Sequence, residues 1–463
     1  MHRRKLTAAA GVAVAALALT ACAGQGSTTT PSADLPELPD GAEYNPRAFE
    51  GESIRLLFIE HPFVSTVEPL IPEFEAMTGI DVEIEVLAEQ QGFDKLQADL
   101  SNKAGNYDVF MTDPLHNWQY AAAGWLEPLE EYIASEQLTA PGYDVDDFAP
   151  GIYGAGRWTL EPLQGIGEGS TWGLPINFES YNLTYRPSMF EAAGVEVPET
   201  YEELLDAVQK LNASLPADQY PIVTRFDRYW DLTYLTFGSM AQSYGVELLD
   251  ADGNVAIASP QGVEAAELFL EIVKSGSPDD AAAFTWYEVL QGFASGRFAI
   301  AFNEADLFAP TYENPDESAV SDDVGYAMVP AGPKGRSTGA WIWQVSMNSA
   351  SKHKGAAWTF MQWLTSKEVL NETHKAGNMN PVRLSAWEDA ELAAMVDEWG
   401  AEPGQYREVL EGTAEIAGIR VPPHPELTRA LDIWAEALQK SYFDGNTEAN
   451  LQEAAAQIER ILK

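Results

Sequence analysis

Apolar runs alternate with helical patterns along residues 53–124, and this alternation constrains the fold more than any other feature of the sequence. Compact or alternating apolar runs predict strands, and apolar residues at helical spacing predict helices. Strands are expected at 53–59, 80–87 and 107–111, and helices at 65–77, 92–103 and 118–123. A β-α-β-α-β order of this kind predicts a parallel sheet covered by helices.

Polar and aromatic side chains follow the first and third of these strands. In open parallel sheets, ligands bind beyond the carboxyl ends of the strands. The residues found there, and therefore candidates for ligand contact, are Glu60, His61, Asp113, Asn117 and Trp118. Two plainer interpretations stay open: His61 as a loop histidine before a proline, and Asp113-Pro114 as a turn that starts a helix.

The stretch Thr171–Glu203 predicts a passage from one folded body to another. A short apolar run carrying Asn177 and Glu179 is followed by a second β-like run, 181–185, and then by helical patterns. Thr200 and Glu203 have the spacing of a capping box, in which each side chain satisfies a free amide of the first helical turn. We expect a hinge here, with a ligand beside Asn177 and Glu179.

The remainder of the chain predicts further helices and strands in a second body. Helices are expected at 201–211, 231–244, 260–275 and 354–364, and strands at 220–224, 298–302, 324–329 and 339–347. The segment 225–231 is dense in aromatic, guanidinium and acidic groups, and it contains Arg228 and Trp230. It is interpreted either as part of a binding site or as a solvated helix start with internal salt bridges.

The first 21 residues have the anatomy of a signal peptide, with a basic start and an uncharged apolar run too short to span a membrane. Leu19-Thr20-Ala21-Cys22 resembles a bacterial lipobox, which implies that Cys22 becomes the lipidated first residue of the mature chain. Lipid chains would anchor the protein to the outer face of the membrane without spanning it. The alternative is an ordinary secreted protein with a chance cysteine. Residues 22–45 are expected to form a flexible tether.

Composition excludes several classes of function. A chain of 463 residues is too long for one ordinary domain and fits two. A net charge of −44 repels nucleic acid and other polyanions, and it also fits simple solubility. Cys22 is the single cysteine, so no disulfide can form within the chain. The six histidines show no HExxH spacing, so neither a metal site nor a cofactor is expected.

Seven segments in order resemble the family 1 extracellular solute-binding proteins of bacterial ABC importers, the maltose-binding-like class. They are 74–82, 108–129, 181–204, 296–302, 341–366, 380–383 and 445–462. The resemblance implies an α/β protein with two lobes of the periplasmic-binding-protein type (type II), three crossings between the lobes and a ligand cleft between them. The crossings are expected at 177–182, 336–341 and 378–383. Lobe 1 would comprise 46–178 and 341–380, and lobe 2 would comprise 179–340 and 381–463.

The same resemblance implies a monomer that captures a sugar, oligosaccharide or polyol and delivers it to the membrane permease of an ABC transporter. Such a ligand is held by in-plane hydrogen bonds to amides, carboxylates and guanidinium groups, and its C–H faces stack on indoles. Hydrogen-bonding candidates are Glu60, His61, Asp113, Asn117, Asn177, Glu179, Arg228, Asn303, Glu304 and Arg383; stacking candidates are Trp118, Trp230, Trp286, Trp341 and Trp343. Each tryptophan is alternatively a core residue.

Among these candidates, His61, Glu179 and Asn303-Glu304 fall where members of the family place ligand contacts. The segment Asn303–Asp306 lacks the aromatic pair that the maltose-binding pattern has there, so the resemblance does not specify the sugar.

Two rival functions stay open at this point. A surface-anchored glycoside hydrolase would use paired carboxylates such as Asp113 and Glu304, one of them with a raised pKa. A binder of another small solute, such as a peptide or an amine, is the second rival, and an amine would require an aromatic cage with an acid.

Overall fold

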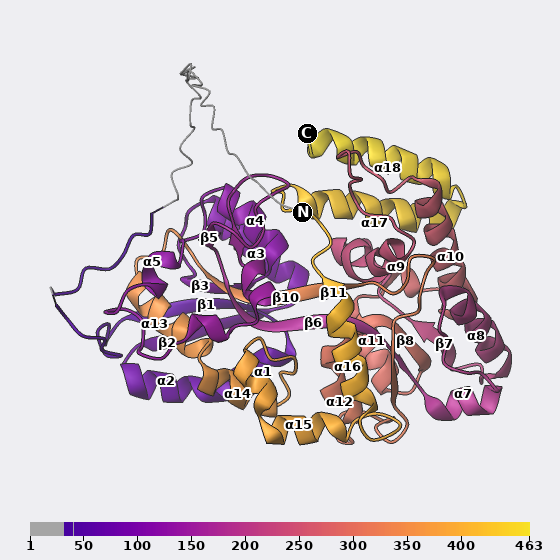
Figure 1. The fold of residues 1–463 in the computed structure, drawn as a ribbon, viewed down its shortest axis with the longest axis horizontal. Helices are drawn as coiled ribbons and strands as arrows, with labels where there is room; N and C mark the ends of the chain where they lie inside the picture. Colours follow the sequence, from indigo (N-terminus) through magenta and orange to yellow (C-terminus); the bar gives the residue numbers. More distant parts are fainter. Residues whose placement is uncertain (1–31, 40) are drawn as a thin grey trace, which may run out of the picture.

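The fold is described from a computed structural model, which covers residues 32–39 and 41–463. The proposed signal peptide and Cys22 lie outside the described residues. Within the described part of the chain, no helix combines the length and apolarity needed to cross a membrane. The molecule is elongated, and the strands within residues 53–112 and those within residues 220–305 occupy opposite ends of one long sheet (Figure 1).

Nine strands form this sheet, in the order β2-β1-β3-β10-β6-β8-β7, with β9 paired to β6 and β11 paired to β10. β1 is parallel to β2 and β3, β7 is parallel to β8, and β11 is parallel to β10. β10 is antiparallel to β3 and β6, and β6 is antiparallel to β8 and β9. The strands are β1 (Ser53–Ile59), β2 (Asp81–Leu87), β3 (Val109–Thr112), β6 (Leu174–Tyr185), β7 (Tyr220–Val223), β8 (Phe298–Ala305), β9 (Gly325–Met328), β10 (Thr338–Met347) and β11 (Ala417–Gly418); β4 (Arg157–Trp158) and β5 (Ser170–Thr171) form a separate pair.

Helices cover both halves of the sheet. The half built on β1, β2 and β3, here the β1 half, carries the early helices together with α13 and α14, and the half built on β7, β8 and β9, here the β8 half, carries α7 to α12 (Figure 1). The main helices are α1 (Pro62–Val67), α2 (Ile71–Thr78), α3 (Glu89–Ser101), α4 (Pro114–Ala122), α5 (Glu130–Ile133), α6 (Pro150–Ala155), α7 (Pro187–Ala193), α8 (Tyr201–Ser214), α9 (Phe237–Ser243), α10 (Pro260–Gly276), α11 (Trp286–Ala294), α12 (Ala309–Glu313), α13 (Lys354–Leu364), α14 (Lys367–Lys375), α15 (Ala390–Asp397), α16 (Gln405–Ile416), α17 (Leu427–Asp444) and α18 (Thr447–Ile461). Short turns are η1 (Glu68–Leu70), η2 (Val145–Asp147), η3 (Leu232–Thr236), η4 (Ala281–Ala283), η5 (Asp306–Phe308) and η6 (Leu384–Glu388), of which η3 is a π-helical turn.

The predicted β-α-β-α-β unit is confirmed, with two differences in its helices. The single helix expected at 65–77 is split into α1, η1 and α2, because Pro69 and Pro72 each lack the N–H that a continuous helix needs. The helix expected from residue 118 begins earlier, at Pro114, because the carboxylate of Asp113 accepts a hydrogen bond from His116 N at 3.0 Å and caps it. The capping box at Thr200 and Glu203 is confirmed.

The passage between the two halves is a continuous strand rather than the two short runs that the sequence predicted. β6 spans Leu174–Tyr185; its first part pairs with β10, and its last part pairs with β8 and β9. β6 and β10 therefore run through the middle of the molecule and join its halves (Figure 1).

Segments from the three predicted crossings lie side by side at this point. Ser180 of β6 pairs with Ala340 of β10. Asn177 Nδ2 donates to Asn378 Oδ1 at 2.8 Å, and Asn380 Nδ2 donates to the carbonyl of Phe178 at 2.9 Å. Three chain segments that are distant in sequence are thus tied together by buried amide hydrogen bonds.

β8 continues past its expected end at Phe302 and reaches Ala305, because a bulge absorbs one residue. Leu183 pairs with Phe302 and Asn182 pairs with Glu304, which leaves Asn303 as the extra residue of β8. Asn303 has a φ of 48°, a left-handed conformation that asparagine tolerates better than most residues. The helix expected at 231–244 is likewise divided, into the π-helical turn η3 and α9.

The segment expected to be a flexible tether contacts the β1 half over part of its length. The amide of Ala33 donates to Glu131 at 3.2 Å, and Tyr132 Oη donates to the carbonyl of Asp34 at 3.0 Å. Leu35 and Leu38 are partly buried against the hydrophobic core. Apolar burial therefore holds residues 32–38 against the folded body, which corrects the expectation for this part of the tether.

Candidate functional site

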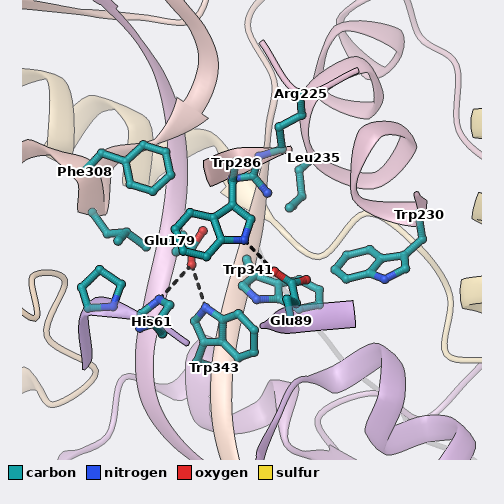
Figure 2. Close-up of a pocket in the computed structure, with 12 residues that line it drawn as sticks. His61, Glu89, Glu179, Arg225, Trp230, Leu235, Trp286, Phe308, Trp341 and Trp343 are labelled. Atoms are coloured by element: carbon teal, nitrogen blue, oxygen red, sulfur yellow. Dashed lines mark hydrogen bonds and ion pairs between the residues drawn. The ribbon is translucent and has the colours of Figure 1, made fainter. Parts of the chain in front are cut away.

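A cavity of about 340 Å³ lies between the β1 half and the β8 half of the molecule. Its walls come from the ends of β1, β2, β7 and β8 and from the middle of β6 and β10, as the rule for carboxyl ends of parallel strands predicts. It is lined by His61, Pro62, Glu89, Glu179, Arg225, Trp230, Leu235, Trp286, Leu307, Phe308, Trp341 and Trp343 (Figure 2).

Strand alternation selects which side chains of β6 and β10 face the cavity. Trp341 of β10 pairs with Glu179 of β6, and Trp343 pairs with Asn177. Successive residues of a strand point to opposite faces. Accordingly, Phe178 and its neighbours on β10 line a separate apolar groove on the other face of the two strands.

The buried carboxylate of Glu179 accepts two hydrogen bonds, and His61 lies near it. Trp343 Nε1 donates to Glu179 Oε1 at 2.7 Å, and Tyr181 Oη donates to Glu179 Oε2 at 2.9 Å. His61 Nε2 lies 3.5 Å from Oε1, too far for an ordinary hydrogen bond (Figure 2). The carboxylate is thus fixed in orientation. Its oxygens can accept more hydrogen bonds than these, so it can also accept one from a ligand hydroxyl.

Indole rings form most of the apolar wall. Trp230 stacks on Trp341 with ring centroids 4.6 Å apart, and Trp341 meets Trp343 edge to face at 5.6 Å. Trp286 lies over Phe308 at 6.0 Å. These rings come from four different elements of both halves, and such flat surfaces suit the C–H groups of a carbohydrate or polyol.

Glu89, at the first position of α3, crosses the cavity to the β8 half. Trp286 Nε1 donates to Glu89 Oε2 at 2.9 Å, and Tyr287 Oη accepts from Glu89 N at 3.3 Å (Figure 2). Burial raises the pKa of Glu89 to about 8, and the charge of Asp231 adds to the rise. The side chain therefore takes up a proton more readily than an exposed glutamate does.

Arg225 is the one arginine that lines the cavity, and two carboxylates behind it fix its position. Its Nε donates to Glu304 Oε2 at 2.9 Å, its amide donates to Glu304 Oε1 at 3.1 Å, and its Nη1 lies 3.3 Å from Asp231 Oδ2. Burial raises the pKa of Glu304 to about 7, while the charge of Arg225 opposes the rise. The guanidinium group is oriented before any ligand arrives.

Two buried donors in the wall have no hydrogen-bond partner among the described residues. They are Nε2 of His61 and Nε1 of Trp230. Burying a polar group without a partner is costly, and a ligand hydroxyl in the cavity would remove that cost. Among residues 32–39 and 41–463, no group of three or more potential ligands is arranged to hold a metal ion.

Six of the residues predicted for the site line this cavity: His61, Glu179, Trp230, Trp286, Trp341 and Trp343. Trp341 and Trp343 of β10 both line the cavity. Their exposed fractions are 2% and 3%, so they are also part of the hydrophobic core. For these two tryptophans, the two interpretations that the sequence left open, a stacking residue of the site and a core residue, are compatible.

Candidates near the third strand serve the structure instead of the cavity. Asp113 caps α4, and Asn117 Nδ2 donates to Gln344 Oε1 at 2.7 Å inside the β1 half. Trp118 is buried in the same core, and Glu60 is exposed next to His61. The helix-start interpretation of Asp113 was therefore the correct one, since its carboxylate is occupied by the first turn of α4.

Candidates in or near the β8 half and the crossings also lie away from the cavity. Asn177 binds Asn378, and Asn303 Nδ2 donates to the carbonyl of Thr236 at 3.0 Å. Glu304 stands behind Arg225. Arg228 is an exposed residue 3.5 Å from Glu436, which matches the solvated salt-bridge interpretation. Arg383 Nε donates to the carbonyl of Thr365 at 2.8 Å, so it holds chain segments together.

Sequence reasoning missed Glu89, Arg225, Leu235, Leu307 and the residues beside them. Glu89 follows β2 and Arg225 follows β7, so the rule for strand ends could have found both. Nothing in the sequence pattern distinguishes Leu235, which reaches the cavity from the π-helical turn η3; such turns are frequent at functional sites.

The carboxylates proposed for glycoside hydrolysis are not brought together in the cavity. Asp113 is occupied by α4, and Glu304 is occupied by Arg225. Neither side chain lines the cavity wall. The arrangement is one of fixed hydrogen-bonding groups between stacked rings, which suits binding.

Comparison with known proteins agrees with this arrangement. The family model for bacterial extracellular solute-binding proteins matches residues 61–370. The erythritol/L-threitol-binding protein of Mycolicibacterium smegmatis is 28% identical over 465 residues, covering 98% of this chain and 95% of that protein. The mannitol-binding protein of Pseudomonas aeruginosa is 26% identical over 320 residues, covering 67% of this chain and 68% of that protein.

Solved structures share the two-lobed fold. A solute-binding protein of an ABC transporter from Agrobacterium radiobacter, in complex with ribitol, is 26% identical with a TM-score of 0.78, over 89% of this chain and 99% of that one. A maltose-bound protein from T. maritima is 20% identical with a TM-score of 0.76, over 89% of this chain and 100% of that one. The expected α/β fold with two lobes is confirmed.

Proposed function

Because the chain belongs to the bacterial extracellular solute-binding protein family, we propose that it is the binding subunit of an ABC importer whose ligand is a short acyclic polyol. The observation that carries the proposal is the cavity: it is small, it is walled by indoles, and its polar groups are suited to hydroxyls. The likeness to an erythritol/L-threitol-binding protein over almost the whole of both chains supports the same ligand class.

Each wall group has a role toward such a ligand. Glu179 and Glu89 accept hydroxyl hydrogens, and Arg225 and His61 Nε2 donate to hydroxyl oxygens. The carbon chain lies against the indoles, with Trp341 at the centre of the stacked group. A linear polyol exposes a C–H edge and a hydroxyl edge, so it can satisfy both kinds of wall together.

We propose the lobe boundaries that the sequence suggested. Lobe 1 takes 46–178 and 341–380, lobe 2 takes 179–340 and 381–463, and β6 and β10 carry the hinge. The ligand would bind both lobes, because Glu89 and His61 come from the first and Arg225 and Trp286 from the second. Closure is then driven by the preference of the ligand for the closed state, and the closed form docks on the permease.

We also propose that the mature protein is lipid-anchored at Cys22 on the outer face of the membrane and acts as a monomer. The lipobox-like segment before Cys22 supports the anchor. Replacing Cys22 by alanine is expected to move the protein from the membrane fraction to the medium. Retention of that variant in the membrane fraction would contradict the anchor.

A thermal-shift screen of the soluble chain without its leader tests the ligand class. Erythritol, L-threitol, ribitol, D-mannitol, glucose and maltose are compared at equal concentration, since a ligand that binds only the native state raises Tm. We expect the largest rise with one of the four polyols. No rise with any of them would overturn the proposal, as would conversion of a labelled glycoside to products, which would favour a hydrolase.

A further inference from the structure

We propose that Leu307 and Pro62 form a wall that limits ligand length, and that a polar groove behind this wall would hold a sugar unit if the wall were opened. The inference rests on the proposed polyol-binding function. Leu307 and Pro62 line the cavity of about 340 Å³ and also a second groove of about 720 Å³. They are the two residues that the linings of these spaces share.

The outer groove has the chemistry of a carbohydrate site. Its lining includes Thr311, Asn314, Glu317 and Lys375, together with Trp399 and Pro310. Asn314 Nδ2 donates to Glu317 at 2.9 Å, and Lys375 Nζ lies 3.0 Å from Glu391. Hydroxyl, amide and ammonium groups bind sugar hydroxyls, and the indole offers a flat apolar face. The groove is somewhat more open to solvent than the inner cavity.

Leu307 is fixed by the residue before it. Asp306, at the start of η5, accepts a hydrogen bond from Ser180 N at 3.1 Å, and its side chain also accepts from Asn380. The carbonyl of Asp306 accepts from Tyr406 Oη at 3.0 Å. Because Asp306 is tied to β6, to a crossing segment and to α16, the backbone that carries Leu307 is held in place by buried hydrogen bonds.

Pro62, in the other half of the molecule, is held in place by its position at the start of α1. It is the first residue of α1, where the proline ring sets the backbone φ. His61, the residue that caps this helix, accepts a hydrogen bond from Phe63 N at 3.0 Å through Nδ1. The wall is therefore made of two apolar residues, one from each half, and each of them lines both the inner cavity and the outer groove.

This arrangement predicts selectivity for length. In this proposal the polyol occupies the inner cavity, and a glucosyl unit that extends from it toward the outer groove meets Leu307 and Pro62. Steric exclusion by rigid apolar residues rejects the longer ligand without affecting recognition of the hydroxyls inside. Shortening the wall would join the two spaces into one.

Maltitol, a hexitol that carries one glucosyl unit, is the probe that tests the wall. Isothermal titration compares maltitol with erythritol, ribitol and D-mannitol on the wild type and on Leu307→Ala, Pro62→Ala and Leu235→Ala. Leu235 lines the inner cavity but not the outer groove, so Leu235→Ala is the matched control. The readout is the ratio of maltitol affinity to the affinity for the best short polyol, which cancels a general loss of binding.

We expect this ratio to rise by about tenfold or more in Leu307→Ala or Pro62→Ala and to change by less than about threefold in Leu235→Ala. Circular dichroism confirms that each variant is folded, and Leu307→Val replaces Leu307→Ala if the latter does not fold. The proposed limit on ligand length would be overturned if the affinity ratio were unchanged in folded Leu307→Ala and Pro62→Ala, or if it rose equally in Leu235→Ala. So would wild-type binding of maltitol as tight as that of the short polyols. If the wild type bound none of the short polyols, the proposed function itself would fail.

Discussion

Trp286 donates a hydrogen bond from Nε1 to Oε2 of Glu89 at 2.9 Å, and this bond joins the first turn of α11 to the first turn of α3 across the cavity. The two residues belong to opposite halves of the molecule. Their hydrogen bond therefore depends on how close the two halves lie, and it is also part of the cavity wall. Its loss should be visible in both stability and ligand binding.

Trp286→Phe keeps an aromatic ring at this position and removes the donor to Glu89. Leaving a buried carboxylate without its partner should lower the free energy of unfolding by about 1–3 kcal/mol. The affinity for the polyol should fall as well, since the closed form loses a contact between the halves. Thermal denaturation and calorimetric titration measure the two effects. Trp387→Phe is the matched control: it removes a donor to the carbonyl of Pro381 at 3.0 Å from a residue that is 40% exposed. Water can replace that bond, so the free energy of unfolding should fall by less than about 1 kcal/mol.

The raised pKa of Glu89 predicts how the stability of the ligand-free protein depends on pH. A carboxyl whose pKa is about 8 in the folded state and near its ordinary value when unfolded holds more protons when folded between these values. Its contribution to stability is thus fully present below about pH 4.5 and is lost as the pH rises through 8.

Glu89→Gln should flatten this dependence, because an amide does not titrate. The wild type is expected to lose more of its free energy of unfolding than Glu89→Gln does between pH 5.5 and pH 8, by roughly 1–3 kcal/mol. Urea denaturation at both pH values measures the difference. Parallel pH profiles of the two proteins would contradict the burial of Glu89.

Arg225→Met leaves the carboxylates of Glu304 and Asp231 buried without a cation. Breaking a buried charge pair from one side should lower the free energy of unfolding by about 3–5 kcal/mol. The matched control is Arg228→Met, which removes an exposed guanidinium group three residues along the chain and should cost less than about 1 kcal/mol. Equal effects of the two substitutions would show that Arg225 is not held as described.

Asn380→Ala tests the amide hydrogen bonds that tie the crossings together. Asn380 has a φ of 69°, and its Nδ2 donates to the carbonyl of Phe178 at 2.9 Å. Alanine loses the bond and tolerates the left-handed backbone less well, so the free energy of unfolding should fall by about 1–3 kcal/mol. The exposed Asn102→Ala serves as the control. If Asn380→Ala left the free energy of unfolding unchanged, Asn380 would not contribute to holding the crossings together.

The fold was predictable from the sequence to the extent that local patterns determine it. The apolar run Ser53–Ile59 specifies β1 with both of its bounds, and the capping box at Thr200 specifies the start of α8; both are confirmed. The end of α8 is Ser214 and not residue 211 as predicted. The continuity of β6 was not predictable, because Asn177 and Glu179 interrupt its apolar pattern. These polar residues remain buried in the strand because their partners are Asn378 and Trp343, which lie 201 and 164 residues further along the chain.

The site was predictable where a strand end or a strand face decides the direction of a side chain. His61 follows β1, and Trp341 and Trp343 alternate with residues of the other face. Where the conformation of a turn determines the direction of a side chain, the sequence does not predict that direction. Arg225 and Arg228 stand three residues apart in one polar segment, and the position of Glu304 on a bulged strand determines which of them faces the cavity.

Calorimetric titration of erythritol, L-threitol, ribitol and D-mannitol into the wild type and Glu179→Gln tests the central claim most directly. Glu179 is fixed by Trp343 and Tyr181, so the glutamine variant keeps its shape while it loses charged acceptor capacity toward the ligand. The account predicts one-to-one binding of at least one of these polyols by the wild type and an affinity lower by about 10–1,000-fold in Glu179→Gln. Binding of none of the four by the wild type, or equal affinity of the two proteins for the polyol that binds, would contradict it.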